Sequence, residues 1–361
     1  MKITIIGAGN AGSTVAADLS LKGHEVTLLK TSDKLHNRHF SHILKRQSIT
    51  IIEDGLEQTA KVHVTTDAAA AIPGRELLIL YIQTNYHEDI IRRISAYIED
   101  GQTILIEPGY LSTCYFLKHC TKDITIVEAE SSPIDCRITA PGQVTVLFRN
   151  VRNPVGVYPT EKTEQAKALL VQLQYPFTYL TSVTEAALHN PNLIVHTIGA
   201  IMSVPRIEYA AAHGTSYSMY REVFTPHVWN MVQSLDAEKM DVLEKLGCER
   251  LAYVDACKYR NSLKDERDAT EVFFDYAHNS SPTGPDIPDS RYVTEDVPEG
   301  LVLLESLGIM LSIPTPTCTG LINCAEALLN REFRREGRTI ERLGSEWLAK
   351  VLGRTAASKQ N

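Results

Sequence analysis

Three polar residues in the second half of the chain have types suited to proton transfer and carboxylate binding. His196 follows Asn192 by one helical turn, so both side chains would lie on one face of a helix. Arg291 and Asp296 stand close together further along the chain. An arginine fork suits a substrate carboxylate, and an aspartate can hold a histidine in one tautomer and favour its protonated form. These residues are therefore the candidates for a catalytic constellation.

Each of these residues also has a purely structural explanation. A histidine among apolar neighbours such as Val195 and Ile198 is more often a satisfied core residue than a catalytic one. Thr294 has the type of a helix N-cap, with acidic residues in the first turn and Pro298 near the start. Both explanations can hold for Asp296, which could serve in either role.

A glycine-rich turn near the N-terminus has the spacing of a dinucleotide site. Gly7, Gly9 and Gly12 follow a β-branched strand, with Asn10 and Ala11 between the last two glycines at the start of a helix-prone stretch. The first glycine allows the tight turn, the second lets backbone approach a pyrophosphate, and the third permits close packing of helix on strand. The motif alone is weak, but the complete strand–helix–strand unit favours a cofactor site over a bare turn.

The end of the second strand bears on cofactor choice. Lys30 and Thr31 stand where NAD-dependent enzymes usually carry an acidic residue for the ribose hydroxyls, and Arg38 follows after a short loop. A lysine and a hydroxyl can hold a 2′-phosphate. We therefore expect NADP(H) to be preferred over NAD(H). The alternative is that Lys30 is a solvated charge while Asp33 turns inward to the ribose.

Hydrophobic periodicity predicts the elements that must position these residues. In the first half, short β-branched runs alternate with helical stretches, the pattern of an α/β protein with a doubly wound parallel sheet of the Rossmann type. Strands are expected at 3–6, 24–29, 77–82, 103–106 and 124–127, with two more between 144 and 157, and helices at 13–22, 87–99 and 162–173.

From Ser182 onward the apolar spacing becomes helical. We predict two domains: a dinucleotide-binding Rossmann domain at 1–181 and a mostly α-helical, substrate-binding domain at 182–361. The expected helices of the second domain are 186–212, 225–246, 300–311 and 319–331, and the loop 279–290, which is rich in proline and glycine, is expected to be irregular.

Composition excludes several classes of protein. The 361 residues are 43% apolar and 22% charged, which fits a globular chain and not a disordered or collagenous one. The net charge of -8 argues against nucleic-acid partners and an anionic membrane surface, so we expect small-molecule substrates. The seven cysteines have no metal-ligand spacing, and we expect reduced thiols, no metal and a cytoplasmic location. A homodimer is the assembly we consider.

On these motifs the chain resembles the opine dehydrogenases, the octopine and nopaline dehydrogenase family, over nearly its whole length. The glycine motif is shared by many dehydrogenases, whereas the histidine motif joined to the arginine–aspartate segment is much more particular. The matching segments are Gly7 to Gly12, Pro141-Gly142-Gln143-Val144, Asn190-x-Asn192-x-x-x-His196, Phe224-Thr225-Pro226, Arg291-Tyr292-x-x-Glu295-Asp296-Val297, Pro314-Thr315-Pro316 and Phe333-Arg334-Arg335-Glu336-Gly337-Arg338-Thr339.

The resemblance implies an NAD(P)H-dependent oxidoreductase that carries out reductive amination. The family condenses the amine of an L-amino acid with an α-keto acid, commonly pyruvate, and reduces the imine to a secondary amine dicarboxylate. The substrates would meet the nicotinamide in the cleft between the domains. By motif match, His196 would be the general acid/base, Asp296 would orient and charge it, and Arg291 would hold a carboxylate. Asn192 is a further expected substrate contact.

Two departures from the family pattern bear on specificity. Lys30 stands where a similar bacterial member has an acidic residue, and Glu107-Pro108-Gly109-Tyr110 replaces a smaller Asn-Pro-Gly-Ala. We therefore expect a narrower or more acidic pocket near the nicotinamide. Glu128, Glu130 and Cys136 are expected to border the cleft, where a carboxylate would select a cationic amino acid such as arginine or lysine. A solvated loop is the alternative for that stretch.

Two other functions stay open from the sequence. An NADP-dependent enzyme that reduces a 2-keto acid or oxidises a β-hydroxy acid would share the Rossmann unit and the helical second domain, although such enzymes often employ a lysine where His196 stands. A non-catalytic dinucleotide-sensing protein would retain the glycine motif. It would have no need of His196, Arg291 and Asp296 together.

Overall fold

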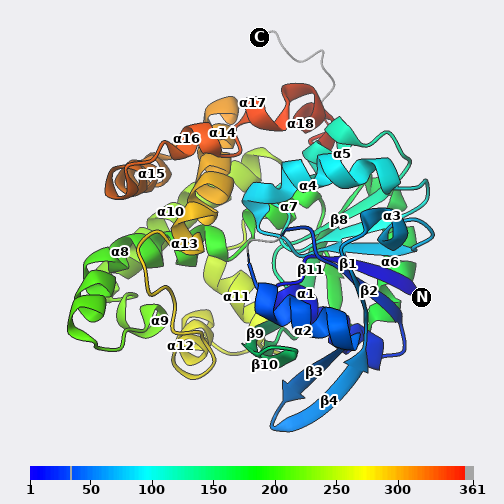
Figure 1. The fold of residues 1–361 in the computed structure, drawn as a ribbon. Coiled ribbons are helices and arrows are strands. Elements are labelled where there is room, and N and C mark those ends of the chain that lie inside the picture. The colour runs from blue at the N-terminus through cyan, green and yellow to red at the C-terminus, as the bar shows by residue number, and fades with distance from the viewer. Residues whose placement is uncertain (33–34, 354–361) are drawn as a thin grey trace. The chain divides into compact units, whose positions relative to one another are not determined.

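The chain folds into two compact units, Met1–Ala186 and Ala187–Asn361 (Figure 1). The computed structural model describes residues 1–32 and 35–353. The first unit carries the described strands and the second is built from helices. This arrangement confirms the predicted fold class, a Rossmann-type sheet followed by a helical part.

An eight-stranded, mainly parallel sheet forms the centre of the first unit. Neighbours from β8 to β5 pair in parallel, whereas β11 runs antiparallel to β8. The middle strands are buried from end to end, as expected for strands covered on both faces. The spatial order is β12 (Phe177–Tyr179), β11 (Asn153–Tyr158), β8 (Thr125–Ala129), β7 (Thr103–Ile106), β6 (Leu77–Leu80), β1 (Lys2–Ile6), β2 (Glu25–Leu29) and β5 (His63–Thr65).

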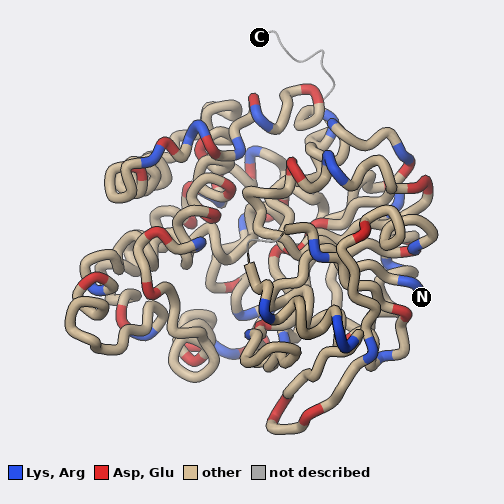
Figure 2. Tube along the Cα trace, in the orientation of Figure 1, with Lys and Arg blue, Asp and Glu red and all other residues tan. Residues whose placement is uncertain are grey.

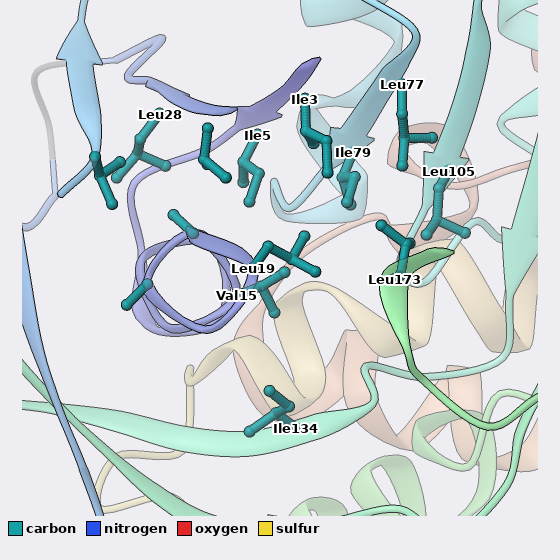
Figure 3. Close-up of a cluster of buried hydrophobic side chains, with 14 of the residues drawn as sticks. Ile3, Ile5, Val15, Leu19, Leu28, Leu77, Ile79, Leu105, Ile134 and Leu173 are labelled. Carbon is teal, nitrogen blue, oxygen red and sulfur yellow. The ribbon is translucent and has the colours of Figure 1, made fainter. Parts of the chain in front are cut away.

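Helix α1 (Asn10–Leu21) packs against this sheet and against a second, smaller one. Figure 3 shows Val15 and Leu19 of α1 beside Ile5 and Leu28 of the main sheet, with Ile134 of the smaller sheet on the other side of the helix. The sequence pattern predicts β10 but not its neighbours. The order in the smaller sheet is β4 (Leu56–Lys61), β3 (Ser48–Glu53), β10 (Gln143–Arg149) and β9 (Ile134–Ala140).

The remaining helices of the first unit are short. Two expected helices end in 3₁₀ turns, so the α-helical parts stop earlier than predicted, at Ile94 and Leu170. The helices are α2 (Asn37–Arg46), α3 (Ala68–Ala71), α4 (His87–Ile94), α5 (Thr113–His119), α6 (Thr163–Leu170) and α7 (Val183–Leu188), and the 3₁₀ turns are η1 (Thr84–Tyr86), η2 (Ser95–Tyr97), η3 (Thr160–Lys162) and η4 (Val171–Leu173).

The second unit is organised around its longest helix, α8 (Asn192–His213), which packs against α10, α13 and α15. The prediction of one helix over 186–212 is wrong: the chain breaks before Asn192, because Pro191 has no N–H to continue a helix from α7. The other helices are α9 (Met219–Glu222), α10 (Pro226–Lys245), α11 (Tyr253–Asn261), α12 (Ala269–Asn279), α13 (Arg291–Thr294), α14 (Val302–Leu311), α15 (Pro316–Leu329), α16 (Phe333–Glu336), α17 (Ile340–Leu343) and α18 (Ser345–Val351), with a π-helical turn η5 (Val297–Leu301) before α14.

Charged residues of both signs are interspersed along the trace (Figure 2). Within the described part of the chain, no helix has both the length and the apolar character needed to cross a bilayer. Over the same residues, no group of three or more His, Cys, Asp or Glu side chains is arranged to hold a metal ion.

Candidate active site

A buried hydrogen bond joins the predicted histidine to the predicted aspartate. Nδ1 of His196 lies 2.8 Å from Oδ2 of Asp296, and the two side chains are 7% and 3% exposed. His196 is in the second turn of α8, and Asp296 lies between α13 and the π-helical turn η5. A carboxylate accepts and does not donate, so Nδ1 carries a proton and donates it to Asp296. The pair therefore has the geometry of an orienting aspartate and its histidine.

An aromatic ring holds the imidazole from a second direction. The ring of Tyr292 stacks on His196 with a centroid distance of 3.7 Å and an angle of 9° between the planes. Tyr292 belongs to the short helix α13, which packs against α8. The bond to Asp296 fixes the imidazole within its plane and the stacked ring fixes that plane. The sequence motif included Tyr292 without assigning it a role.

Arg291 is the first residue of α13 and presents a half-exposed guanidinium. Its Nη1 lies 3.7 Å from Oε2 of Glu295, and the side chain is 55% exposed. The negative charge of Glu295 raises the pKa of Arg291, which keeps the guanidinium charged. A charged, accessible fork one residue from Tyr292 is suited to binding a carboxylate.

The helix-cap interpretation of this segment holds in part: the turn η5 begins at Val297 with Pro298 and Glu299 in its first turn, but the residue before it is Asp296 and not Thr294. Thr294 is the last residue of α13 and not a cap, and its Oγ1 donates to the carbonyl of Ser290 at 3.1 Å. The carboxylate of Asp296 is bonded to His196. His196 is buried, as the core interpretation expects, and its hydrogen bond to Asp296 agrees with either role.

Asn192 lies on α8 with His196, as predicted, and is half-buried. Its N–H donates to Oδ1 of Asn190 at 3.0 Å, a bond that holds the start of the helix. That bond places the predicted substrate contact at the N-terminal end of α8. The role of its side chain stays a prediction.

The glycine turn has the backbone geometry that the motif requires. Gly7 has a φ of +119°, and a Cβ there would lie 2.1 Å from the carbonyl oxygen of Tyr81. A Cβ on Gly12 would lie 1.8 Å from the carbonyl oxygen of Gly7. Gly9 has no such constraint, because its φ is -90° and the nearest atoms to a Cβ belong to His36 at 3.8 Å. The turn and the packing therefore explain Gly7 and Gly12, whereas the space beside Gly9 is open.

The helix that follows the turn is tied to the smaller sheet. Oδ1 of Asn10 accepts from the backbone N–H of Ile138 at 2.8 Å, and α1 begins at Asn10, with Ala11 next to it. The start of this helix is half-buried. Such a helix start fits a pyrophosphate group, whose oxygens accept from backbone N–H groups and favour the positive end of the helix.

The residues expected at the adenosine end lie beside the same turn. Nζ of Lys30 donates to the carbonyl of Leu35 at 2.6 Å, and the carbonyl of Thr31 accepts from Arg93 at 3.3 Å. Arg38 is exposed in the first turn of α2. Asp33, which the alternative interpretation would place on the ribose, lies outside the described residues.

His36 is a residue of this region that the sequence did not single out. Its ring is the nearest group to the open side of Gly9, and burial together with the charge of Lys30 lowers its pKa. Its backbone is left-handed, with a φ of 56°, at the start of α2. The sequence contains no periodicity or motif that could have indicated this position.

Glu128 has a structural role, which corrects the expectation that it selects the amino acid. It is fully buried, and its carboxylate accepts from the N–H groups of Leu111 and Thr113 at 2.9 and 2.6 Å and from the hydroxyl of Thr113 at 2.7 Å. One oxygen therefore satisfies Thr113 at the start of α5, whose first N–H groups have no partner within the helix, and the other satisfies the backbone just before it.

Cys136 also differs from its expected place at a substrate pocket. It lies in the hydrophobic core of the first unit, where burial raises the pKa of its thiol to about 11. A neutral thiol packed among apolar side chains contributes to the core. We therefore do not assign Cys136 to the substrate.

Glu107, which belongs to one of the two departures from the family pattern, has a buried carboxyl group. The hydroxyl of Tyr81 donates to the Glu107 carboxylate, and burial raises the pKa of Glu107 well above its ordinary value. A raised pKa favours the neutral acid. This position therefore adds bulk more than negative charge, in contrast to the acidic pocket that we expected.

Comparisons with known proteins identify the chain. Residues 179–329 match the α-helical domain of NAD/NADP octopine/nopaline dehydrogenase, a range that includes His196, Arg291 and Asp296, and residues 2–111 match the N-terminal part of NAD-dependent glycerol-3-phosphate dehydrogenase. An opine dehydrogenase from Arthrobacter sp. (strain 1C) is 27% identical over 360 residues, covering 98% of this chain and 97% of that protein. Residues 179–329 therefore belong to the octopine/nopaline dehydrogenase α-helical domain family, and the chain as a whole is similar to opine dehydrogenases. The chain is an NAD(P)-dependent dehydrogenase.

Solved structures show the same fold. Octopine dehydrogenase in complex with NADH and agmatine has a TM-score of 0.76 at 18% identity and is covered completely, as is this chain. Yersinopine dehydrogenase with NADP+ bound has a TM-score of 0.71 at 14% identity, covering 99% of this chain and 96% of that one. The two structures were solved with different dinucleotides, so the likeness in fold does not indicate which one this chain prefers.

Proposed function

We propose that this protein reduces the imine formed from an L-amino acid and an α-keto acid. The observation that carries the proposal is the buried 2.8 Å bond between His196 and Asp296 on the segment that also carries Arg291. This segment combines an acid–base group with a carboxylate-binding cation. An imine reduction between two carboxylate-bearing substrates requires both.

The reaction balances with one hydride and one proton. The amine attacks the keto carbon, water leaves, and a C=N bond replaces the C=O bond. A hydride adds to the carbon and a proton to the nitrogen, which gives a secondary amine dicarboxylate. The nicotinamide supplies the hydride when it is bound. The protein supplies position, charge and protons.

His196 is the group to which we assign the proton transfers. Nδ1 is engaged by Asp296, so Nε2 is the nitrogen that would face the substrate, donating a proton to the departing hydroxyl oxygen. The carboxylate of Asp296 stabilises the charged imidazolium before the transfer and keeps the ring in one tautomer. The stacked ring of Tyr292 limits rotation of the imidazole, which keeps the acceptor and donor atoms aligned.

Arg291 is the group to which we assign a substrate carboxylate. Its guanidinium is accessible and lies next in sequence to Tyr292, which contacts His196. A bidentate bond to a carboxylate would fix the orientation of the reacting carbon relative to the imidazole. Asn192, one turn before His196 on α8, would contribute a further polar contact.

The first unit binds the dinucleotide in this proposal, and the second binds the amino acid and the keto acid. Gly7, Gly9 and Gly12 with the start of α1 fit a pyrophosphate, since the open side of Gly9 leaves backbone accessible. We propose NADPH as the preferred donor, with the 2′-phosphate held by Lys30 and Arg38.

Cofactor choice is tested by steady-state kinetics with NADPH and NADH. We expect a higher kcat/KM for NADPH, and Lys30→Ala should raise the KM for NADPH about 10- to 150-fold, the value of one charge-assisted bond. The matched control is Lys45→Ala, an exposed lysine on α2, which should leave both constants unchanged. A wild-type preference for NADH would refute the assignment.

We also infer a cytoplasmic enzyme, because its reaction consumes a reduced dinucleotide, and cell fractionation tests this location. The assembly considered is a homodimer. Sedimentation equilibrium on the purified chain distinguishes it from a monomer.

The reaction itself is tested by a screen of the twenty amino acids, each combined with pyruvate, glyoxylate or 2-oxoglutarate. The oxidation of NADPH is the signal measured. We expect oxidation that requires both an amino acid and a keto acid. Rapid oxidation with a keto acid alone would instead indicate a 2-keto acid reductase. Binding of NADPH without any turnover across the screen would favour a dinucleotide sensor.

A further inference from the structure

A fully buried ion pair holds the turn that follows Asp296 in the chain. Nε of Arg338 donates to a carboxylate oxygen of Glu299, and the two side chains are 0% and 2% exposed. Glu299 is in the π-helical turn η5, for which Asp296 is the N-terminal flanking residue. Arg338 comes from the connection between α16 and α17, far along the chain.

The backbone of the segment around Arg338 is also hydrogen-bonded to the turn. The N–H of Arg338 donates to the carbonyl of Pro298 at 2.9 Å. A Cβ on Gly337 would lie 2.4 Å from that same carbonyl oxygen, so only glycine allows this close approach. One side-chain bond and one backbone bond therefore fasten residues 337–338 to the turn.

The turn η5 is also bonded to the residue that precedes Asp296. The N–H of Glu299 donates to the carbonyl of Glu295 at 3.0 Å, and η5 packs against α8, which carries His196. A displacement of Glu299 would therefore move the backbone that carries Asp296. Single π-helical turns occur frequently at functional sites, and Pro298, which lacks an N–H, interrupts the regular helix here.

The stability of the folded protein does not by itself explain a buried ion pair. Removing two charges from water is costly, and well-packed apolar residues of similar volume often stabilise a core equally well. An ion pair instead fixes direction, because a guanidinium and a carboxylate meet in a restricted geometry. A carboxylate that must reach an imidazole nitrogen at 2.8 Å needs a backbone held in that way.

We propose that Arg338 and Glu299 are positioning residues for the reaction: their pair fixes η5 so that Asp296 meets His196. The inference rests on the proposed function for its kinetic consequence. Neither residue contacts the reacting atoms, and both act through Asp296.

The test replaces the whole pair with apolar residues, Arg338→Met with Glu299→Leu, to avoid leaving one charge buried and alone. We expect a melting temperature near that of the wild type and a fall in kcat of about tenfold or more. In the reductive direction, the pH at which the rate falls should move to lower values, as in Asp296→Asn. In an Asp296→Asn background, the same double replacement should cause no further loss, because its effect passes through that carboxylate.

A matched control is available in the same unit. Arg334 and Glu305 form another ion pair, with 2.7 Å between Nε and Oε2, and they lie outside the candidate site. Arg334→Met with Glu305→Leu should leave kcat and the pH profile near those of the wild type. Two results would refute the positioning role. One is an unchanged kcat in the variant that carries both Arg338→Met and Glu299→Leu. The other is a fall in kcat in that variant that adds fully to the fall caused by Asp296→Asn.

A second readout is independent of turnover. Nδ1–H protons bonded to carboxylates resonate far downfield, and ¹⁵N-histidine labelling with His196→Gln as the assignment variant identifies the His196 signal. We expect this signal in the wild type and its loss or upfield shift when Arg338 and Glu299 are replaced. A signal that persists unchanged overturns the inference, whereas a protein that keeps this NMR behaviour and lacks amine-dependent activity overturns only the proposed reaction. If the double variant does not fold, Arg338→Lys supplies the same two measurements with the charge retained.

Discussion

Replacement of Asp296 with asparagine removes one charge from a buried pair while keeping the size of the side chain. An amide oxygen can still accept from Nδ1 of His196, but it does not stabilise a positively charged imidazole. In the proposed reaction the imidazolium is the proton donor, so the variant should be less often in its active form. The effect should appear in kcat and in its dependence on pH.

The magnitude follows from the geometry of the pair. A hydrogen bond to a charged group stabilises by about 1.5 to 3 kcal/mol, and burial of both groups favours the upper part of that range because water does not screen them. At about 1.4 kcal/mol per factor of ten, kcat should fall about 10- to 150-fold. Since the Arg291 side chain is unchanged, the KM for the keto acid should change little.

The assay is NADPH oxidation at saturating amino acid and keto acid across pH 5 to 10. The rate of the variant should begin to fall at a lower pH than that of the wild type, because the imidazolium is lost sooner without the carboxylate. Glu305→Gln is the matched control, since it removes a buried carboxylate charge elsewhere in the same unit. An unchanged kcat and pH profile in Asp296→Asn would refute the reasoning.

Three further predictions follow from individual residues. Arg291→Ala should raise the KM of one carboxylate substrate about 10- to 150-fold with a smaller change in kcat, measured by varying each substrate in turn; a change in kcat alone would contradict a binding role. Gly9→Ala should weaken dinucleotide binding in calorimetry and leave the melting temperature near that of the wild type, whereas Gly12→Ala should lower both because a Cβ there meets the Gly7 carbonyl; equal effects of the two variants would argue against a ligand at Gly9. His39 is buried, and this lowers its pKa from 6.5 to about 4, so its neutral form contributes stability that is complete above pH 6.5 and is lost as the pH falls toward 4. Urea unfolding of the transition that involves the first unit should therefore lose about 2 kcal/mol between pH 7.5 and 5.0 on account of this ring, and a His39→Gln variant with the same pH dependence would exclude it.

The sequence predicted the parts of the fold in which local pattern and tertiary role coincide. The strand, glycine turn and helix at the N-terminus are one example, because Gly7 and Gly12 are required by backbone conformation and packing alone. The smaller sheet was predicted only in part. Its strand β4 is mostly exposed, so the sequence there lacks an apolar run that could indicate a strand.

The site was predicted in its principal residues but not in what supports them. His196 and Asp296 have types that suggest each other, and their contact could be inferred from chemistry. The stacking of Tyr292 and the pairing of Arg338 with Glu299 depend on how distant segments meet, which residue types do not specify. For Glu128 the sequence predicted a substrate role where the structure shows a structural one. A carboxylate that caps a helix cannot be distinguished in the sequence from one that binds a substrate.

The most direct test of the central claim follows the hydride into the product and compares the rate of the wild type with that of His196→Gln. NADPH deuterated at the transferable position is mixed with the purified protein, an amino acid and a keto acid, and the product is analysed by mass spectrometry. We predict one deuterium in a secondary amine dicarboxylate that forms only when both substrates are present, at a rate reduced about 10² to 10⁴-fold in His196→Gln. Deuterium in a 2-hydroxy acid without a new C–N bond, or an equal rate in His196→Gln, would contradict the account.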